Sequence, residues 1–217
     1  MSVMKTGPKI VLASASKRRI ELIEALDAAV EMVPAAIDER VARLGERAEG
    51  YVLQTAESKV RDVAGTLASD SVVIGADTAV VLDGRILGKP ADADEARRML
   101  TELRGRTHRV LTGVAVTRTD TGSGASSVKS SEVVMRDYSD SEIEAYVESG
   151  EPFDKAGGYA IQDTHFAPVE RLAGCYLNVV GFPMCEVTSL LATIGPAVPL
   201  RHDWRAPDRC PTDCPVR

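Results

Sequence analysis

Cysteine and long apolar runs are scarce in this sequence. Its 217 residues include four cysteines, too few for a disulfide-built scaffold. Cys210 and Cys214 have no second Cys or His pair beside them, which argues against a zinc site. No stretch approaches the roughly 18 apolar residues of a membrane span, and the N-terminus lacks the apolar core of about 7–15 residues typical of a signal peptide. We therefore expect a cytoplasmic protein without a membrane partner.

Aromatic residues and positive charge are also in short supply. Aromatics make up 4% of the chain, so the core must be mostly aliphatic. The 26 Lys and Arg against 32 Asp and Glu give a net charge of −6. This balance argues against a protein that binds nucleic acid by neutralising many phosphates, but it allows a local cationic pocket for a small anion. No G-x-G-x-x-G follows the first apolar run, so a dinucleotide-binding oxidoreductase is not indicated.

Apolar residues alternate between strand and helix patterns along the chain. Short apolar runs and the turn Asp83-Gly84 predict strands and a hairpin, and apolar stripes at helical spacing predict helices. The predicted strands are 10–14, 30–34, 71–76, 79–82, 85–87, 109–117 and 128–135, followed by short strands up to Val180. The predicted helices are 17–26, 47–67, 92–104, 139–147 and 183–194. This order favours an α/β fold with a mixed sheet flanked by helices.

The end of the chain differs in character from the rest. Residues 1–194 carry the periodic pattern, and we expect them to form one domain. Residues 195–217 are rich in proline and show no periodic apolar stripe. We expect this segment to be a mobile tail with no periodic apolar face to bury.

Two strand ends could carry chemistry. Ser14 to Arg19 places two hydroxyls and two guanidiniums at a strand-to-helix turn, which suits a phosphate. An N-cap followed by solvated basic residues is the alternative interpretation. Asp77 follows the apolar strand 71–76, and ligands of open α/β sheets bind at such strand ends. Its carboxylate could hold Mg²⁺ or accept a proton from water, or it could simply form a turn.

Two loops add further polar groups. Lys89 lies in the constrained turn Gly88-Lys89-Pro90, just after the predicted hairpin. Residues 150–162 combine glycines, which allow close approach to a ligand, with Lys155 and Gln162. The Gln162 amide could read the edge of a base, with Lys155 supplying charge. A surface loop that leads into a strand is the alternative for this segment.

Five motifs together resemble the Maf family of nucleoside triphosphate pyrophosphatases. In chain order they are LASASKRRIEL, IGADTAVVLDGRILGKP, GRTHRVLTGVAV, GEPFDKAGGYAIQ and NVVGFP, and the likeness runs from about Lys9 to Ile194. The resemblance implies a cytoplasmic α/β protein that is related in fold to the inosine-triphosphate pyrophosphatases, and it suggests a homodimer. It also implies hydrolysis of a nucleoside triphosphate to monophosphate and pyrophosphate with a divalent metal, Mg²⁺ or Mn²⁺.

The resemblance assigns roles to individual residues. It implies that Asp77 is the general base and that Glu39 and Asp77 hold the metal. It implies a phosphate path lined by Ser14, Arg19, Lys59 and Lys89. It implies base selection by Arg18, Thr78 and Gln162, and the Asp-Lys-Ala-Gly run with Gln162 resembles the branch that prefers dTTP and UTP over the branch that prefers 7-methyl-GTP.

The sequence departs from the family pattern at two places. Lys17 stands where a proline usually precedes the arginine pair, and residues 163–171 replace a stretch that is more often glycine-rich. A purine or broad base preference is therefore one alternative within the same reaction. A non-catalytic nucleotide-binding regulator of septum formation is an alternative of another class. Pyrophosphate release from a panel of triphosphates would separate them.

Overall fold

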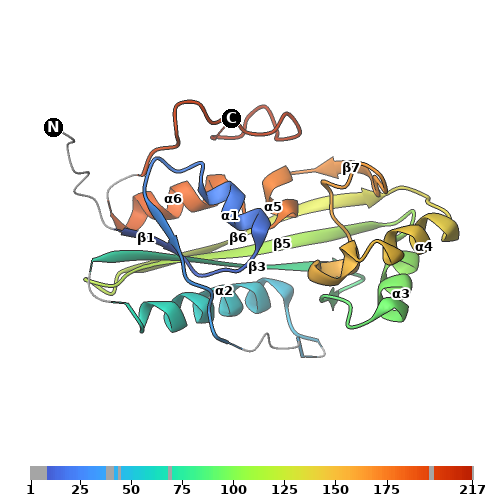
Figure 1. Ribbon diagram of the computed structural model, residues 1–217, viewed down its shortest axis with the longest axis horizontal. Helices are drawn as coiled ribbons and strands as arrows, with labels where there is room; N and C mark the ends of the chain where they lie inside the picture. The colour runs from blue at the N-terminus through green and yellow to red at the C-terminus, as the bar shows by residue number, and fades with distance from the viewer. Residues whose placement is uncertain (1–8, 38–41, 44, 68–69, 196–197, 217) are drawn as a thin grey trace.

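A mixed β-sheet runs through the centre of the molecule (Figure 1). The computed structural model describes residues 9–37, 42–43, 45–67, 70–195 and 198–216. The strands in these ranges are β1 (Lys9–Leu12), β2 (Val30–Met32), β3 (Ser71–Leu82), β4 (Arg85–Leu87), β5 (Thr107–Arg118), β6 (Gly124–Met135) and β7 (Val169–Ala173). The helices are α1 (Lys17–Ile23), α2 (Ala48–Ala64), α3 (Ala93–Leu103), α4 (Asp140–Glu148), α5 (Tyr176–Val180) and α6 (Met184–Ile194), with 3₁₀ turns η1 (Glu151–Asp154) and η2 (Ala156–Gly158). Within the described ranges, none of the helices combines the length and apolar character that crossing a membrane requires.

The strand order is β2-β1-β3-β5-β6-β7, with β4 paired to β3. β1 lies parallel to both β2 and β3, whereas the other pairs are antiparallel. The expected mixed sheet flanked by helices is therefore confirmed. The β3–β4 hairpin forms at the predicted turn, where Asp83 and Gly84 have φ of 50° and 78°. Positive φ at both positions gives the turn the twist that joins two antiparallel strands.

Helices cover both faces of the sheet. α2 lies against one face, and α1, α5 and α6 lie against the other (Figure 1). Side chains alternate along β3, so Val73 packs with Val60 of α2, whereas Ile74 packs with the cluster that includes Leu177 of α5. The two layers of apolar side chains form the core and fix where each helix sits over the sheet.

Two glycines allow α2 to lie unusually close to the sheet. A Cβ added at Gly113 of β5 would be 2.6 Å from the carbonyl of Val52, and one at Gly75 of β3 would be 2.7 Å from Cγ2 of Val60. No side chain other than hydrogen fits at these distances. The close contact brings α2, and with it Lys59, directly over β3.

Side chains cap the starts of two helices, α3 and α4. The Asp92 side chain accepts from the backbone N–H of Glu95 at the start of α3, and Ser139 with Glu142 forms a capping box at the start of α4. Such caps are visible in the sequence because they join residues three positions apart.

Two predictions of secondary structure are wrong. The predicted strands 71–76 and 79–82 are one continuous strand, so Asp77 lies in the middle of β3 rather than at its end. The short strands expected up to Val180 are one strand, β7, followed by α5. Gly174 and Gly181 flank α5 with φ of 117° and 107°, and these left-handed residues turn the chain on both sides of it.

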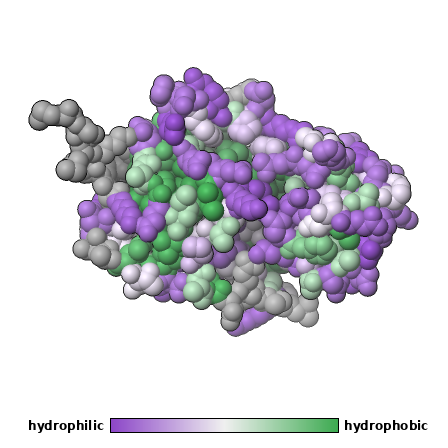
Figure 2. Space-filling model, in the orientation of Figure 1, coloured by the Kyte–Doolittle hydropathy of each residue, from purple (hydrophilic) through white to green (hydrophobic). Residues whose placement is uncertain are grey.

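The C-terminal segment buries apolar side chains although it has no periodic apolar face. Ala206 and Cys210 are buried, and Leu200 forms a β-bridge with Leu26 just after α1. This segment, dark red at the top of Figure 1, presents a mostly hydrophilic outer surface in Figure 2. Its apolar residues contact the core through turns rather than through a regular stripe, which is why periodicity did not reveal them. The division at residue 194 and the mobility of the segment remain predictions.

Candidate functional site

The cleft forms at a gap in the sheet beside β3. β1 pairs with β3 only up to the Leu12–Ile74 position, and β4 begins to pair with β3 at Val80. Between these positions, the side of β3 toward β1 lines an open cleft of about 640 Å³, a volume suited to a small-molecule ligand. Asp77 lies within β3, but it is close to the end of a strand, because the neighbouring strand β1 stops just before it.

Eight of the nine predicted site residues line this one cleft. They are Ser14, Arg18, Arg19, Lys59, Asp77, Thr78, Lys89 and Gln162. They come from the β1–α1 turn, the start of α1, α2, β3, the segment after β4 and the loop before β7. The ninth, Glu39, lies outside the described residues. The structure brings the eight together; the role of each stays a prediction.

Asp77 and Lys59 form a buried ion pair inside the cleft. Lys59 Nζ lies 2.7 Å from Asp77 Oδ1, and both side chains are only 10–12% exposed. The pair joins α2 to β3 on the face where Gly75 allows close approach. A charge-assisted hydrogen bond of this length fixes the direction of the carboxylate. No local pattern in the sequence indicates this cation beside Asp77, because the two residues are 18 positions apart.

Arg19 joins the start of α1 to β3 and to the turn after α5. Its Nη1 donates to the carbonyl of Ala76 at 2.7 Å, its Nε to the carbonyl of Gly181 at 2.9 Å, and its Nη2 to Thr78 Oγ1 at 3.1 Å. Ala76 lies in the open stretch of β3, so the guanidinium takes the place of a missing neighbouring strand there. Arg19 thus has a clear role in holding the cleft walls, while its predicted phosphate contact stays a prediction.

A chain of hydroxyls fixes the hydrogen-bonding character of Thr78. Thr78 and Thr112 lie opposite each other in β3 and β5, and their Oγ1 atoms are 3.0 Å apart. Thr112 donates its hydroxyl hydrogen to the carbonyl of Asn178 at 2.9 Å. Thr78 must therefore donate to Thr112, because each hydroxyl has only one hydrogen. With Arg19 donating to it as well, Thr78 can offer a ligand only its remaining lone pair. Sequence reasoning missed Thr112, which becomes evident only from the strand register.

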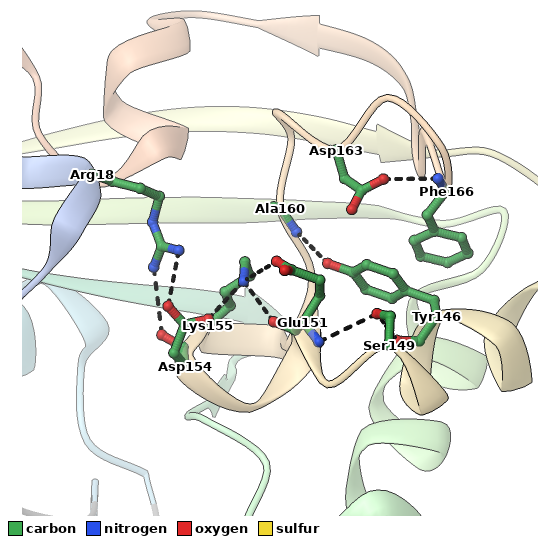
Figure 3. A network of polar contacts seen from close by, with 9 residues as sticks. All are labelled: Arg18, Tyr146, Ser149, Glu151, Asp154, Lys155, Ala160, Asp163 and Phe166. Atoms are coloured by element: carbon green, nitrogen blue, oxygen red, sulfur yellow. Dashed lines mark hydrogen bonds and ion pairs between the residues drawn. The ribbon is translucent and has the colours of Figure 1, made fainter. Parts of the chain in front are cut away.

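Arg18 and Lys155 meet at the carboxylate of Asp154 (Figure 3). Arg18 Nη1 donates to Asp154 Oδ2 at 3.1 Å, and Lys155 Nζ donates to Oδ1 at 2.6 Å and to Glu151 Oε2 at 3.0 Å. Partial burial works to raise the pKa of Asp154, but the hydrogen bond from Lys155 and the charge of Arg18 outweigh it and lower that pKa. Lys155 lines the cleft and forms ion pairs with two carboxylates, so the suggestion that it supplies charge to a ligand stays a prediction. These ion pairs tie η1 into one rigid unit.

Ser14 and Lys89 line the cleft from the two strands that border the gap, since Ser14 follows β1 and Lys89 follows β4. Ser14 is 7% exposed, and its Oγ accepts a hydrogen bond from the backbone N–H of Ser16 at 3.2 Å. Lys89 is exposed and follows Gly88, whose carbonyl accepts from the backbone N–H of Gly157 at 2.9 Å. That bond joins the segment after β4 to η2. It therefore fixes Lys89 relative to the loop of Gln162, which follows η2 in the chain.

A hydrogen-bonded pair at the cleft, His108 and Tyr159, was missed by sequence reasoning. Nε2 of His108 lies 2.6 Å from the hydroxyl of Tyr159, and the two rings meet edge to face. Tyr159 lines the cleft, whereas His108 is 3% exposed and its Nδ1 has no partner among the described residues. Burial lowers the pKa of His108 to about 4, because the imidazolium would lose its hydration.

We expect His108 to make the fold sensitive to mild acid. A native pKa of about 4 against 6.5 in the unfolded chain means that unfolding takes up a proton between these values. The stabilising contribution is therefore complete above pH 6.5 and is lost as pH falls toward 4. Between pH 7.5 and pH 5 the wild type should lose about 2 kcal/mol more stability than His108→Gln, whose amide can still bond Tyr159. Urea unfolding of both proteins at the two pH values measures this, and equal losses would contradict it.

The described residues fit a divalent metal that arrives with a phosphate ligand. Among them, no group of three His, Cys, Asp or Glu side chains could hold a metal alone. Mg²⁺, however, is commonly bound by one or two carboxylates together with substrate phosphates and water. Asp77 supplies one such carboxylate inside the cleft, which also has hydroxyls and cations suited to phosphate. The predicted second ligand, Glu39, is outside the described residues.

Comparisons with known proteins agree with the motifs that line the cleft. The family model described as Maf-like protein matches residues 9–194. The dTTP/UTP pyrophosphatase of Anaeromyxobacter dehalogenans is 48% identical over 203 residues, which cover 93% of this chain and 100% of that one. The dTTP/UTP pyrophosphatase of Dictyoglomus thermophilum is 43% identical over 187 residues, or 86% and 96% of the two chains. A HAM1 protein from Coxiella burnetii aligns in structure over 60% of this chain and 74% of that one, with a TM-score of 0.42 and 16% sequence identity. This structural similarity is too low to carry an argument. Because the model spans most of the chain and the curated relatives match over nearly their whole length, the chain belongs to the Maf family.

Proposed function

We propose that this protein hydrolyses dTTP and UTP to the nucleoside monophosphate and pyrophosphate. The observation that carries the proposal is the buried Asp77 carboxylate, fixed by Lys59, in a cleft that is also lined by the other predicted site residues that the structure describes. The names of the relatives, dTTP/UTP pyrophosphatases at 43–48% identity, support the same reaction. Nucleoside triphosphates are cytoplasmic metabolites, so we place the activity in the cytoplasm, and we carry over a homodimer from the family resemblance.

The chemistry requires water to attack the α-phosphorus in line with the departing pyrophosphate. Asp77 accepts the proton of this water, and Lys59 keeps the receiving carboxylate in one direction. Lys59, Lys89 and the Ser14 hydroxyl offset the negative charge that grows on the leaving oxygens. A divalent metal bound with the triphosphate through Asp77 and Glu39 would add charge neutralisation at the phosphate oxygens. Arg19 contributes by holding the open stretch of β3 to α1.

The hydroxyl hydrogen of Thr78 is already donated to Thr112, and this supports a preference for uracil and thymine. Thr78 donates to Thr112, so it can only accept a hydrogen bond from a base. The N3–H group of uracil or thymine can donate such a bond, whereas N3 of cytosine is an acceptor and would face another lone pair. Arg18 and the exposed amide of Gln162 lie on the same cleft and complete the proposed base-reading set.

A panel of triphosphates tests the reaction and the base preference together. With Mg²⁺ or Mn²⁺ we expect UTP and dTTP to yield monophosphate and pyrophosphate, and we expect EDTA to abolish the activity. An unpaired buried polar group costs about 1–3 kcal/mol, so specificity constants for CTP, ATP, GTP and 7-methyl-GTP should be roughly 5- to 150-fold lower. Products are separated by ion-exchange chromatography.

Each part of the proposal can fail separately in this panel. Orthophosphate and the diphosphate as sole products would mean attack at the γ-phosphorus and would refute the reaction. Equal specificity constants across the panel would refute the base preference and leave the reaction standing. Tight nucleotide binding without any turnover would favour the non-catalytic regulator instead.

A further inference from the structure

The C-terminal segment is attached to the core at a defined place. The backbone N–H of Asp27 donates to the carbonyl of Pro199, and that of Arg201 donates to the carbonyl of Ala25, both at 2.8 Å. These two bonds flank the bridge between Leu26 and Leu200. In Figure 1 the segment then passes above α1 and α5. It lies outside residues 9–194, the part of the chain that the family model matches.

One side chain of this segment reaches the loop that carries Gln162. Arg209 Nη1 donates to the carbonyl of Ile161 at 3.2 Å. The same guanidinium lies over the ring of Tyr176 in α5, 5.8 Å from its centroid, a distance typical of a cation–π contact. Tyr176 is largely buried, so α5 gives the guanidinium a firm support. Ile161 and Gln162 both line the cleft.

The contacted carbonyl belongs to the one peptide unit that can flip in this turn. The backbone N–H of Asp163 donates to the carbonyl of Ala160 at 3.3 Å, which closes a four-residue turn with Ile161 and Gln162 at its centre. The two common turn types differ by rotation of the central peptide, and the second type needs positive φ at the third residue. Gln162 does not have positive φ. A bond to the Ile161 carbonyl therefore holds the turn in the form that sets the direction of the Gln162 side chain.

The two sides of the turn are held by other groups. The Tyr146 hydroxyl accepts from the backbone N–H of Ala160 at 3.2 Å, and the Asp163 carboxylate accepts from the backbone N–H of Phe166 at 2.8 Å (Figure 3). These bonds fix the ends of the turn but not its central peptide. Among the described residues, Arg209 is the one whose side chain donates a hydrogen bond to the central peptide.

We propose that Arg209 is a positioning residue for base recognition, which it serves by fixing the central peptide of the turn at residues 160–163. The C-terminal segment is then part of the specificity apparatus of this protein rather than an appendage. The step from the turn to substrate choice rests on the proposed function, because it assumes that Gln162 reads the base. The effect of Arg209 on the turn itself does not depend on that assumption.

The test compares Arg209→Met with Arg205→Met. Methionine keeps much of the length of the stem and removes the donor and the charge. Arg205 is a matched control in the same segment, since its guanidinium donates only to the carbonyls of His202 and Trp204 among the bonds of the described structure. In Arg209→Met we expect a KM for UTP and dTTP raised about 3- to 10-fold, a kcat within about twofold of wild type, and weaker discrimination against CTP. Arg205→Met should match wild type, and Arg209→Lys, which retains a donor, should recover part of the loss.

Two further measurements isolate the mechanism. Hydrogen exchange followed by mass spectrometry should show faster exchange at residues 161–166 in Arg209→Met but not in Arg205→Met. In a Gln162→Ala background, Arg209→Met should add little to KM, because both changes act through the same side chain.

The outcomes separate this proposal from the proposed function. Unchanged exchange at residues 161–166 in Arg209→Met would overturn the role of Arg209 whatever the substrate. With an active wild type, an unchanged KM or fully additive effects in the double variant would overturn its role in base recognition. A wild type that hydrolyses neither dTTP nor UTP would refute the proposed function, and the exchange experiment would still decide the effect of Arg209 on the turn.

Discussion

Replacing Asp77 with asparagine is expected to lower the turnover number by about 10²–10⁴, the usual contribution of a positioned general base. Asparagine keeps the size of the side chain and removes the proton acceptor and the negative charge. Its amide oxygen can still accept a bond from Lys59 Nζ, so the free energy of unfolding should fall by no more than about 1–3 kcal/mol. Turnover of UTP and the melting temperature should be measured on the same preparation.

A matched control for this variant lies on the same hairpin. Asp83→Asn makes the same chemical change at the turn after β3, outside the cleft, where Asp83 contacts Arg106. It should retain wild-type turnover. Near-normal turnover in a well-folded Asp77→Asn protein would remove Asp77 from the mechanism and make Glu39 the next candidate. A loss of activity that only follows the loss of stability would indicate a structural carboxylate.

Ending the chain at Gly195 is expected to lower the melting temperature by about 6–20 °C. The removed segment covers the core cluster with two buried residues, Ala206 and Cys210, and with partly buried residues such as Leu200 and Trp204. Burial of one large apolar side chain contributes about 1.5–3 kcal/mol, so a loss of roughly 3–5 kcal/mol is expected. At about 2–4 °C per kcal/mol for a domain of this size, this gives the stated shift. The composition of the segment alone predicts the opposite, an almost unchanged melting temperature.

Two neighbouring point variants provide the control for the truncation. Trp204 packs against the core cluster, whereas the next residue, Arg205, is exposed. Trp204→Ala should lower the melting temperature by several degrees, and Arg205→Ala should leave it within about 1 °C of wild type. A truncated protein that melts within about 3 °C of the full chain would show that the segment contributes little, as its lack of periodicity suggests. Calorimetry of the four proteins measures all of these shifts.

Local sequence signals determined much of this protein. The caps of α3 and α4 and the turn at Asp83-Gly84 join residues within three positions of each other, and their chemistry constrains the backbone wherever they occur. The alternation of strand and helix patterns was enough to predict a mixed sheet with helices on its faces. The resemblance to the Maf family also assigned eight residues that the fold collects in one cleft, and seven of them lie within the five motifs.

Contacts between distant residues were decided only by the tertiary structure. The pairing of Lys59 with Asp77, the hydroxyl chain from Thr78 to Thr112, and the hold of Arg209 on the loop of Gln162 join elements that are far apart in the chain. None of these contacts leaves a periodic or local pattern. The position of Asp77 shows the same limit, since it depends on where β1 stops rather than on where β3 does. A sequence determines which backbone conformations and which buried faces are favourable nearby, but the groups that meet across a cleft depend on how strands and helices pack.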